Sequence, residues 1–240
     1  MSERVHVSFV IPIYNEEGIL HAAVVDLHER LAPLGLRYEI VLAENGSRDR
    51  TLEVARELQS KYPEVRSLSV GEPNYGRAMR AGILDARGDI VICDEIDLCD
   101  VDFHRQAIAL IEHGDAEMVI GSKLIAGASD QRPLFRHATS IVYTTLLKLL
   151  VDFRGSDTHG LKAFRRESVA PIVSACLTDK DVFASEFVIR AYRAGLRITE
   201  IPIRVMEKRP PSINLLKRVP NVLKNLGKLT WAVRIGGRDI

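Results

Sequence analysis

The first half of the chain alternates between short apolar runs rich in β-branched residues and longer segments with apolar residues at helical spacing. The apolar runs, which we expect to be buried strands, cover 5–13, 37–43, 65–70, 89–93 and 116–121. The expected helices cover 16–34, 50–61, 75–86 and 103–112. This alternation restricts the fold to the α/β class, with helices on both faces of a mostly parallel sheet.

The second half of the chain is less regular. We expect a long, mostly apolar helix over 133–150, a short mixed segment at 159–166, a helix over 182–194 and a strand over 198–205. No linker, repeat or low-complexity tract divides the sequence. The sequence therefore predicts one α/β domain over 1–212, followed by a basic, amphipathic helical tail over 213–240.

Composition excludes several classes of function. The net charge is +1 over 240 residues, so nucleic acid is not an expected partner. The three cysteines have no paired spacing, which favours a reduced compartment. The amino terminus has no apolar signal core, and no apolar run approaches the ~20 residues that span a bilayer. We expect a cytoplasmic protein, with peripheral binding at the inner face of the membrane as a further option.

Polar loops follow three of the expected strands, at 12–16, 44–49 and 95–97. In a parallel sheet these strand ends lie on one side, where α/β proteins bind ligands. A tyrosine can stack on a base, carboxylates and an asparagine can bond base or ribose edges, and an acidic pair can hold a divalent cation that bridges phosphates. The alternative is that the loops are only polar caps at strand ends.

Five stretches of the sequence together resemble a known family. They are VSFVIPIYNEE, ENGSRDRT, NYGRAMRAGILDARGDIVICDEIDLCD, DTHGLKAFRRE and ITEIPIRVMEKR. Their order and spacing, from about residue 5 to residue 217, resemble glycosyltransferase family 2 and, within it, the dolichol- or polyprenyl-phosphate mannosyltransferase branch. The resemblance implies a GT-A (Rossmann-like) fold. It also implies transfer of a sugar, with inversion, from a nucleotide-sugar donor such as GDP-mannose or a UDP-hexose to a polyprenyl or dolichyl phosphate.

The resemblance assigns a cofactor, Mg²⁺ or Mn²⁺, to Glu95 and Asp97, and gives Asp97 a catalytic role through that metal. Side chains at alternate positions of an extended loop point the same way, so Glu95 and Asp97 can face one cation together. Asp94 is expected to point into the sheet or a neighbouring loop. Asp100 is expected at the start of the next helix. The chain departs from the family in having Glu95 where an aspartate is usual and Cys99 where a glutamine is frequent.

The resemblance also implies two sets of binding residues. The donor nucleotide is assigned to Pro12, Tyr14, Asn15, Glu16, Glu44, Asn45 and Arg77. The acceptor phosphate is assigned to Lys123, Arg136, Ser140 and, in a carboxyl-terminal loop, Arg209. Arg136 and Ser140 are four residues apart, so a helix would place them on one face, where they can hold one phosphate. The alternative is an ordinary helix start with a solvated arginine.

The acceptor decides whether a base is needed. An acceptor phosphate is already anionic and can attack the anomeric carbon without a strong base, whereas a hydroxyl requires one. Asp157, His159 and Glu186 are the candidate bases or sugar contacts. Two alternatives stay open: transfer to a saccharide or small-molecule hydroxyl, and a non-catalytic protein that binds nucleotide sugars.

The tail carries lysines, arginines and a tryptophan along one helical pattern. Val222, Leu226 and Leu229 share one expected face, and Lys224 and Trp231 lie roughly opposite. A helix of this kind either packs on the domain with a solvated basic side or contacts an anionic membrane surface.

Overall fold

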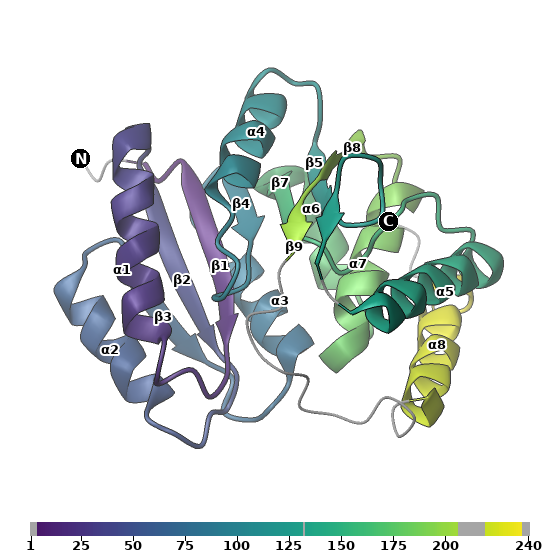
Figure 1. The fold of residues 1–240 in the computed structure, drawn as a ribbon, viewed down its shortest axis with the longest axis horizontal. Helices are drawn as coiled ribbons and strands as arrows, with labels where there is room; N and C mark the ends of the chain where they lie inside the picture. Colours follow the sequence, from purple (N-terminus) through teal and green to yellow (C-terminus); the bar gives the residue numbers. More distant parts are fainter. Residues whose placement is uncertain (1–3, 132, 206–218, 237–240) are drawn as a thin grey trace.

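The computed structural model describes residues 4–131, 133–205 and 219–236. Its main sheet has the strand order β3-β2-β1-β4-β7-β5-β8 (Figure 1). The strands are β1 (Val7–Ile13), β2 (Tyr38–Glu44), β3 (Val65–Ser69), β4 (Ile90–Cys93), β5 (Met118–Ser122), β7 (Lys162–Arg165) and β8 (Ile198–Pro202). β7 runs antiparallel to β4 and β5, and every other pairing is parallel. The expected mostly parallel sheet is confirmed.

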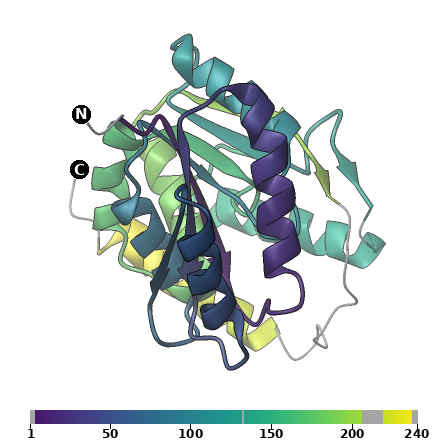
Figure 2. The same ribbon diagram turned by 90° about the vertical axis from the view of Figure 1, so that its left-hand side faces the viewer.

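Helices cover both faces of this sheet (Figure 2). On β1, Phe9 and Ile11 pack into one core cluster while Val10 packs into the other, as the two-residue period of a strand requires. The first cluster holds α1 (Leu20–Leu31), α2 (Thr51–Lys61) and α4 (Val101–Glu112). The second holds α3 (Tyr75–Asp85), α5 (Leu134–Val151), α6 (Arg166–Ala175), α7 (Phe183–Arg193) and α8 (Val219–Arg234).

The structure differs from the expectation in its second half. The mixed segment at 159–166 contains β7, which inserts between β4 and β5 in the middle of the sheet. α6 was not expected, and it contains Pro171, a residue that normally argues against a helix. The strand expected over 198–205 is split into β8 and β9 (Arg204–Val205), and β9 pairs with β6 (Ser129–Asp130) in a small second sheet.

The basic tail contains the helix α8, which packs on the domain. Leu226, Leu229 and Val233 are buried against the cluster that includes α5 and α7. The guanidinium groups of Arg190 and Arg193 donate to backbone carbonyls near the end of α8, at 2.9 and 2.6 Å. Of the helices that the structure describes, none is both long and apolar enough to cross a bilayer.

Candidate active site

The first two polar loops are joined by hydrogen bonds at the carboxyl edge of the sheet. Asn15 has a left-handed backbone (φ 53°), its N–H donates to the Ser47 hydroxyl at 3.0 Å, and its side-chain oxygen accepts from the Arg48 N–H at 2.9 Å. The N–H of Glu16 donates to the Thr51 hydroxyl at 2.6 Å. The structure therefore brings these two loops together, as the parallel sheet predicts. Because Asn15 and Glu16 are held in this loop, α1 begins at Leu20 and not at residue 16.

Glu44 and Asn45, assigned by resemblance to the donor base, are buried and hydrogen-bonded within the protein. The carboxylate of Glu44 accepts from the Ser47 N–H and from the Ser69 hydroxyl. Burial raises the pKa of Glu44, but these hydrogen bonds outweigh it and lower the pKa overall. The side-chain oxygen of Asn45 accepts from the N–H of Asn74, at the start of α3. In this structure both side chains hold the loops in place.

The other residues assigned to the donor have different surroundings. Pro12 is buried within β1, whereas Tyr14 is 38% exposed and presents an aromatic ring at the loop surface. Arg77 forms an ion pair with Glu72 at 2.5 Å, and both side chains are more than half exposed. Arg77 is therefore a surface residue in this structure.

The acidic loop after β4 is a turn, not the extended segment that we expected. The Leu98 N–H donates to the Glu95 carbonyl at 2.9 Å, and Cys99 has a left-handed backbone (φ 41°). Glu95 and Asp97 nevertheless line one pocket, while Ile96 and Cys99 pack into the core. The thiol that stands where the family has a glutamine thus points away from the pocket.

Glu95 occupies an environment that disfavours its negative charge. Burial raises its pKa to about 7; a hydrogen bond from the Tyr75 hydroxyl (2.7 Å) opposes this shift, and the charges of Asp94 and Asp97 add to it. A divalent cation would remove that penalty, and paired carboxylates suit a hard cation. No group of three or more His, Cys, Asp or Glu that could hold a metal occurs among the described residues.

The neighbouring acids lie where the sequence placed them. Asp94 is fully buried, its Oδ2 accepts from His104 Nε2 of α4, and its Oδ1 accepts from the Glu95 N–H at 2.7 Å. Asp100 caps α4 by accepting two backbone N–H groups of the first turn, both at 3.1 Å. Asp94 and Asp100 therefore serve the fold, while Glu95 and Asp97 line the pocket.

The same pocket is also lined by basic residues. The Lys123 ammonium pairs with Asp157 at 2.5 Å, and the other oxygen of Asp157 accepts from the His159 N–H at 2.9 Å. The Lys162 ammonium donates to the Gly160 carbonyl at 2.7 Å. The pocket volume is about 220 Å³. It is lined by Tyr75, Met79, Cys93, Glu95, Asp97, Leu98, Lys123, His159, Gly160, Leu161, Lys162, Ile203 and Val205.

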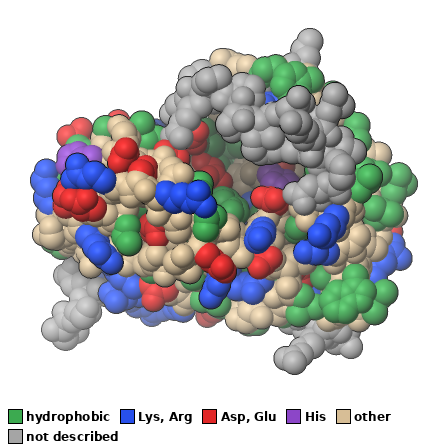
Figure 3. Space-filling model, turned by 90° about the horizontal axis from the view of Figure 1, so that it is seen from below, with side chains coloured by type: hydrophobic (Ala, Val, Ile, Leu, Met, Phe, Trp, Pro, Cys, Tyr) green, Lys and Arg blue, Asp and Glu red, His purple; other side chains and the backbone are tan. Residues whose placement is uncertain are grey.

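This pocket opens at the carboxyl edge of the sheet. Viewed from that side, the surface is hollowed near its centre, and acidic side chains lie in the recess (Figure 3). Tyr75 and Lys162 are pocket residues that the sequence reasoning missed. A signal was present for Lys162, because a lysine between two apolar residues of a short strand is rarely buried without a reason.

The candidate bases of the pocket are poorly suited to remove a proton from a hydroxyl. Burial, reinforced by Lys123 and Lys162 and opposed by Asp157, lowers the pKa of His159 to about 4. Burial raises the pKa of Asp157, but the ion pair with Lys123 outweighs it and lowers the pKa. The His159 ring packs edge-on against Tyr143, with centroids 5.4 Å apart. Neither group is a strong base near neutral pH.

Glu186 does not reach the pocket. Its side chain on α7 is fully buried and accepts from the backbone N–H groups of Leu177 and Thr178, at 2.6 to 3.0 Å. Arg190, one turn later, donates to it at 2.8 Å. These contacts join α7 to the segment that follows α6, which is a structural role.

The residues assigned to the acceptor phosphate are only partly brought together. Lys123 lines the pocket, but its ammonium is paired with Asp157. Arg136 and Ser140 lie one turn apart near the start of α5, and the Ser140 hydroxyl donates to the Arg136 carbonyl at 3.0 Å. Neither lines the pocket. Arg209 lies outside the described residues.

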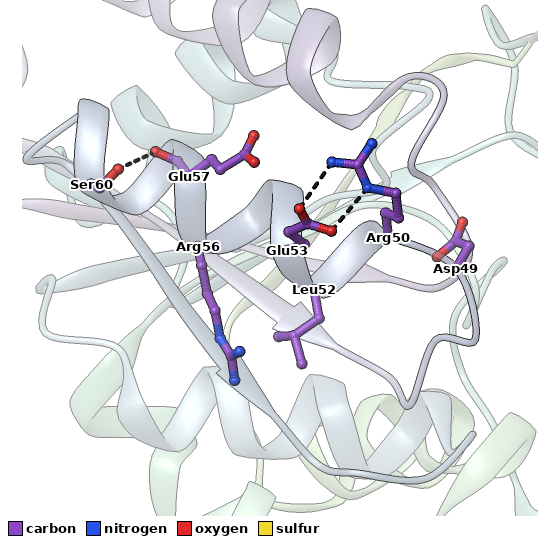
Figure 4. Close-up of a pocket in the computed structure, with 7 residues that line it drawn as sticks. All are labelled: Asp49, Arg50, Leu52, Glu53, Arg56, Glu57 and Ser60. Atoms are coloured by element: carbon purple, nitrogen blue, oxygen red, sulfur yellow. Dashed lines mark hydrogen bonds and ion pairs between the residues drawn. The ribbon is translucent and has the colours of Figure 1, made fainter.

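A second hollow, of about 550 Å³, lies along α2 (Figure 4). It is lined by Asp49, Arg50, Leu52, Glu53, Arg56, Glu57 and Ser60. Arg50 pairs with Glu53 at 2.9 Å, and both side chains are more than half exposed. An exposed ion pair of this kind is an ordinary surface feature.

Comparison with known proteins agrees with this geometry. The model of Glycosyl transferase family 2 matches residues 8–172. Dolichyl-phosphate beta-glucosyltransferase ALG5A of Trichomonas vaginalis is 30% identical over 218 residues, covering 83% of this chain and 65% of that protein. Glycosyltransferase AglD of Haloferax volcanii is 26% identical over 241 residues, covering 98% of this chain and 38% of that protein. The chain thus spans 38% to 65% of the length of these two relatives.

Solved structures show the same fold. Glucosyl-3-phosphoglycerate synthase from Mycobacterium tuberculosis, in complex with Mn²⁺, UDP and glucosyl-3-phosphoglycerate, superposes with a TM-score of 0.65 at 19% identity, covering 99% of this chain and 82% of that chain. Mannosyl-3-phosphoglycerate synthase from Rubrobacter xylanophilus superposes with a TM-score of 0.67 at 15% identity, covering 98% of this chain and 77% of that chain. These matches confirm the expected GT-A fold.

Proposed function

We propose a sugar-transfer reaction for this chain on the premise that it belongs to glycosyl transferase family 2, whose model matches residues 8–172. In this reaction a sugar moves from a nucleotide-diphosphate sugar, such as GDP-mannose or a UDP-hexose, to a polyprenyl or dolichyl phosphate, with inversion. The observation that carries the proposal is one pocket that is lined both by an acidic pair, Glu95 and Asp97, and by the basic residues Lys123 and Lys162.

The acidic side of the pocket suits the donor. Glu95 and Asp97 would hold Mg²⁺ or Mn²⁺, and the bound cation would neutralise charge on the leaving diphosphate. Tyr75 orients Glu95 through its hydroxyl, and Asp94 fixes the Glu95 backbone. The Mn²⁺ and UDP in the Mycobacterium tuberculosis synthase support this proposal.

The basic side suits an acceptor that brings its own negative charge. His159 and Asp157 are weak bases here, because burial holds one neutral and Lys123 holds the other ionised. A lipid phosphate needs no deprotonation near neutral pH, so this pocket serves it better than a neutral hydroxyl. The dolichyl-phosphate glucosyltransferase relative supports this choice.

We also propose that α5 and α8 contact an anionic membrane surface. Phe135, Val142 and Leu149 on α5 and Trp231 on α8 are exposed by 45% to 72%, and the two helices pack together. α8 carries lysines and arginine and no acidic residue. Exposed apolar side chains, a tryptophan and basic charge are the features that bind anionic bilayers.

We expect the double substitution Val142→Glu and Leu149→Glu to reduce binding to vesicles that contain anionic phosphatidylglycerol, because two carboxylates would be driven toward lipid of the same charge. Co-sedimentation with vesicles measures this. Leu84→Glu is the matched control, since Leu84 is 47% exposed on α3 and lies outside the proposed surface. Equal sedimentation of all three proteins would contradict the membrane contact.

Calorimetric titration of GDP- and UDP-sugars with Mn²⁺, Mg²⁺ or EDTA tests the donor site. We expect metal-dependent binding by the wild type and at least a tenfold loss in Asp97→Ala, because one of the two carboxylates is removed. Asp102→Ala is the matched control, since this acid of the same segment is 79% exposed and pairs with Arg105 outside the pocket. Absence of binding by the wild type with either metal would reject the proposed function.

The acceptor is tested separately by transfer of labelled sugar. We expect product with a polyprenyl phosphate and none with the corresponding polyprenol, since the alcohol lacks the anion that attacks the sugar. Product with 3-phosphoglycerate instead would identify a soluble acceptor of the kind named for the structural neighbours, and would reject the lipid.

A further inference from the structure

Lys162 lies at the centre of the sheet, on the short antiparallel strand β7. Its cross-strand neighbours are Cys93 on β4 and Ile120 on β5. The residue is only 7% exposed, and it lines the pocket together with Glu95 and Lys123. Pairing with strands on both sides therefore fixes the backbone of Lys162 at the pocket.

The Lys162 ammonium has more hydrogen-bond donors than the protein uses. It donates to the Gly160 carbonyl at 2.7 Å, its one hydrogen bond within the described part of the chain, where it also has no carboxylate at ion-pair distance. An ammonium has three N–H donors, so two remain. The nearby acids are already engaged, Asp157 by Lys123 and Glu95 by Tyr75.

Burial of a cation without a directly bonded anion is costly. Burial lowers the pKa of Lys162, and Lys123 adds to this effect, while Asp157 and Glu95 oppose it from a distance. An anion that entered the pocket and accepted the two remaining N–H groups would remove this cost. The free side chain is thus arranged for a ligand, not for a contact within the protein.

The position of Lys162 indicates where such an anion would lie. A Cβ added to Gly160 would stand 1.7 Å from the Gly121 carbonyl oxygen, so the backbone here packs directly on the end of β5. Lys123 follows Gly121 by two residues, and Glu95 lines the same pocket. The charges of Glu95, Asp157 and Lys123 all act on the Lys162 ammonium. An anion bound by Lys162 would therefore lie near both the acidic pair and the Lys123–Asp157 pair.

We infer that Lys162 is an anion-binding residue of the pocket, which donates two hydrogen bonds to phosphate oxygens of a substrate. The inference rests on the proposed function, because it takes the phosphate to belong either to the acceptor or to the donor diphosphate. Lys123, already paired with Asp157, then becomes the second and weaker cation at this position.

The test compares the wild type with Lys162→Met, which keeps most of the side-chain length and removes the charge. Farnesyl phosphate, inorganic phosphate and UDP or GDP with Mn²⁺ are each titrated by calorimetry. We expect the affinity for farnesyl phosphate or for the nucleoside diphosphate to fall about ten- to one-hundredfold, as for the loss of charged hydrogen bonds. A fall for farnesyl phosphate assigns Lys162 to the acceptor, and a fall for the nucleoside diphosphate assigns it to the donor.

Lys61→Met is the matched control, since Lys61 is exposed at the end of α2 and lies outside the pocket. A second measurement needs no variant: acetylation of Lys162 in the wild type, followed by mass spectrometry, should slow when the same phosphates are added. Unchanged affinity in Lys162→Met and unchanged acetylation, with donor binding intact, would overturn this inference alone. Loss of all donor binding in the wild type would instead reject the proposed function.

Discussion

Replacing Glu186 with alanine is expected to lower the free energy of unfolding by about 3–5 kcal/mol, the range for removing one member of a buried ion pair. The side chain is fully buried, pairs with Arg190 at 2.8 Å and accepts the backbone N–H groups of Leu177 and Thr178. The substitution would leave a buried guanidinium and two buried N–H groups without their acceptor. Arg190 also donates to a carbonyl near the end of α8, so loss of its partner should loosen that helix.

Urea unfolding measures this effect. Glu167→Ala is the control, because Glu167 is an exposed acid on the neighbouring helix α6 and should change stability little. If Glu186→Ala were as stable as the wild type but had lost transfer activity, the structural role would be contradicted. Glu186 would then have a direct role in the reaction.

Glu186 illustrates what the sequence could not decide. A glutamate at the right distance from other motifs suggested a sugar contact, but its environment is created by segments that meet only in the folded chain. Leu177 and Thr178 precede it on a loop, and the α8 carbonyl that Arg190 contacts comes 42 residues after Arg190. The resemblance correctly identified the family, but it did not determine which acids reach the pocket.

The first half of the fold was predictable because its signals are local. β1 to β4 and the helices between them follow from apolar runs and helical spacing, and their boundaries agree to within a few residues. β7 was not predictable in the same way. Its four residues include Lys162 and Arg165, so it carries no clear strand pattern, and its place in the sheet depends on pairing with β4 and β5.

The acidic segment after β4 contains one feature that the sequence predicts and one that it does not. The pairing of Glu95 with Asp97 in one pocket agrees with the expectation, although a turn and not an extended loop produces it. The interior position of Cys99 was not visible in the sequence, because it depends on a left-handed backbone at that residue. This local conformation turns the Cys99 thiol into the core, while Glu95 and Asp97 line the pocket.

The buried contact between His104 and Asp94 leads to the second prediction. Both side chains are fully buried, and His104 makes its hydrogen bond through Nε2 while Nδ1 has no partner within the described structure. Asp94 uses its other oxygen to hold the Glu95 N–H at 2.7 Å. α4 therefore fixes the end of β4, and through it the backbone of a residue that faces the pocket.

We expect His104→Leu to lower the free energy of unfolding by about 3 kcal/mol, because it leaves the Oδ2 atom of the buried Asp94 carboxylate without a donor. His104→Gln should recover part of this loss, since an amide N–H can replace the single Nε2 hydrogen bond. The double variant Asp94→Ala, His104→Leu should also recover stability, because no buried charge remains. Even so, its affinity for a nucleotide sugar with Mn²⁺ should be lower than that of the wild type, since the Glu95 N–H has lost its acceptor. Urea unfolding measures the change in stability, and calorimetry measures the change in donor affinity. A double variant with the donor affinity of the wild type would show that Asp94 does not position Glu95.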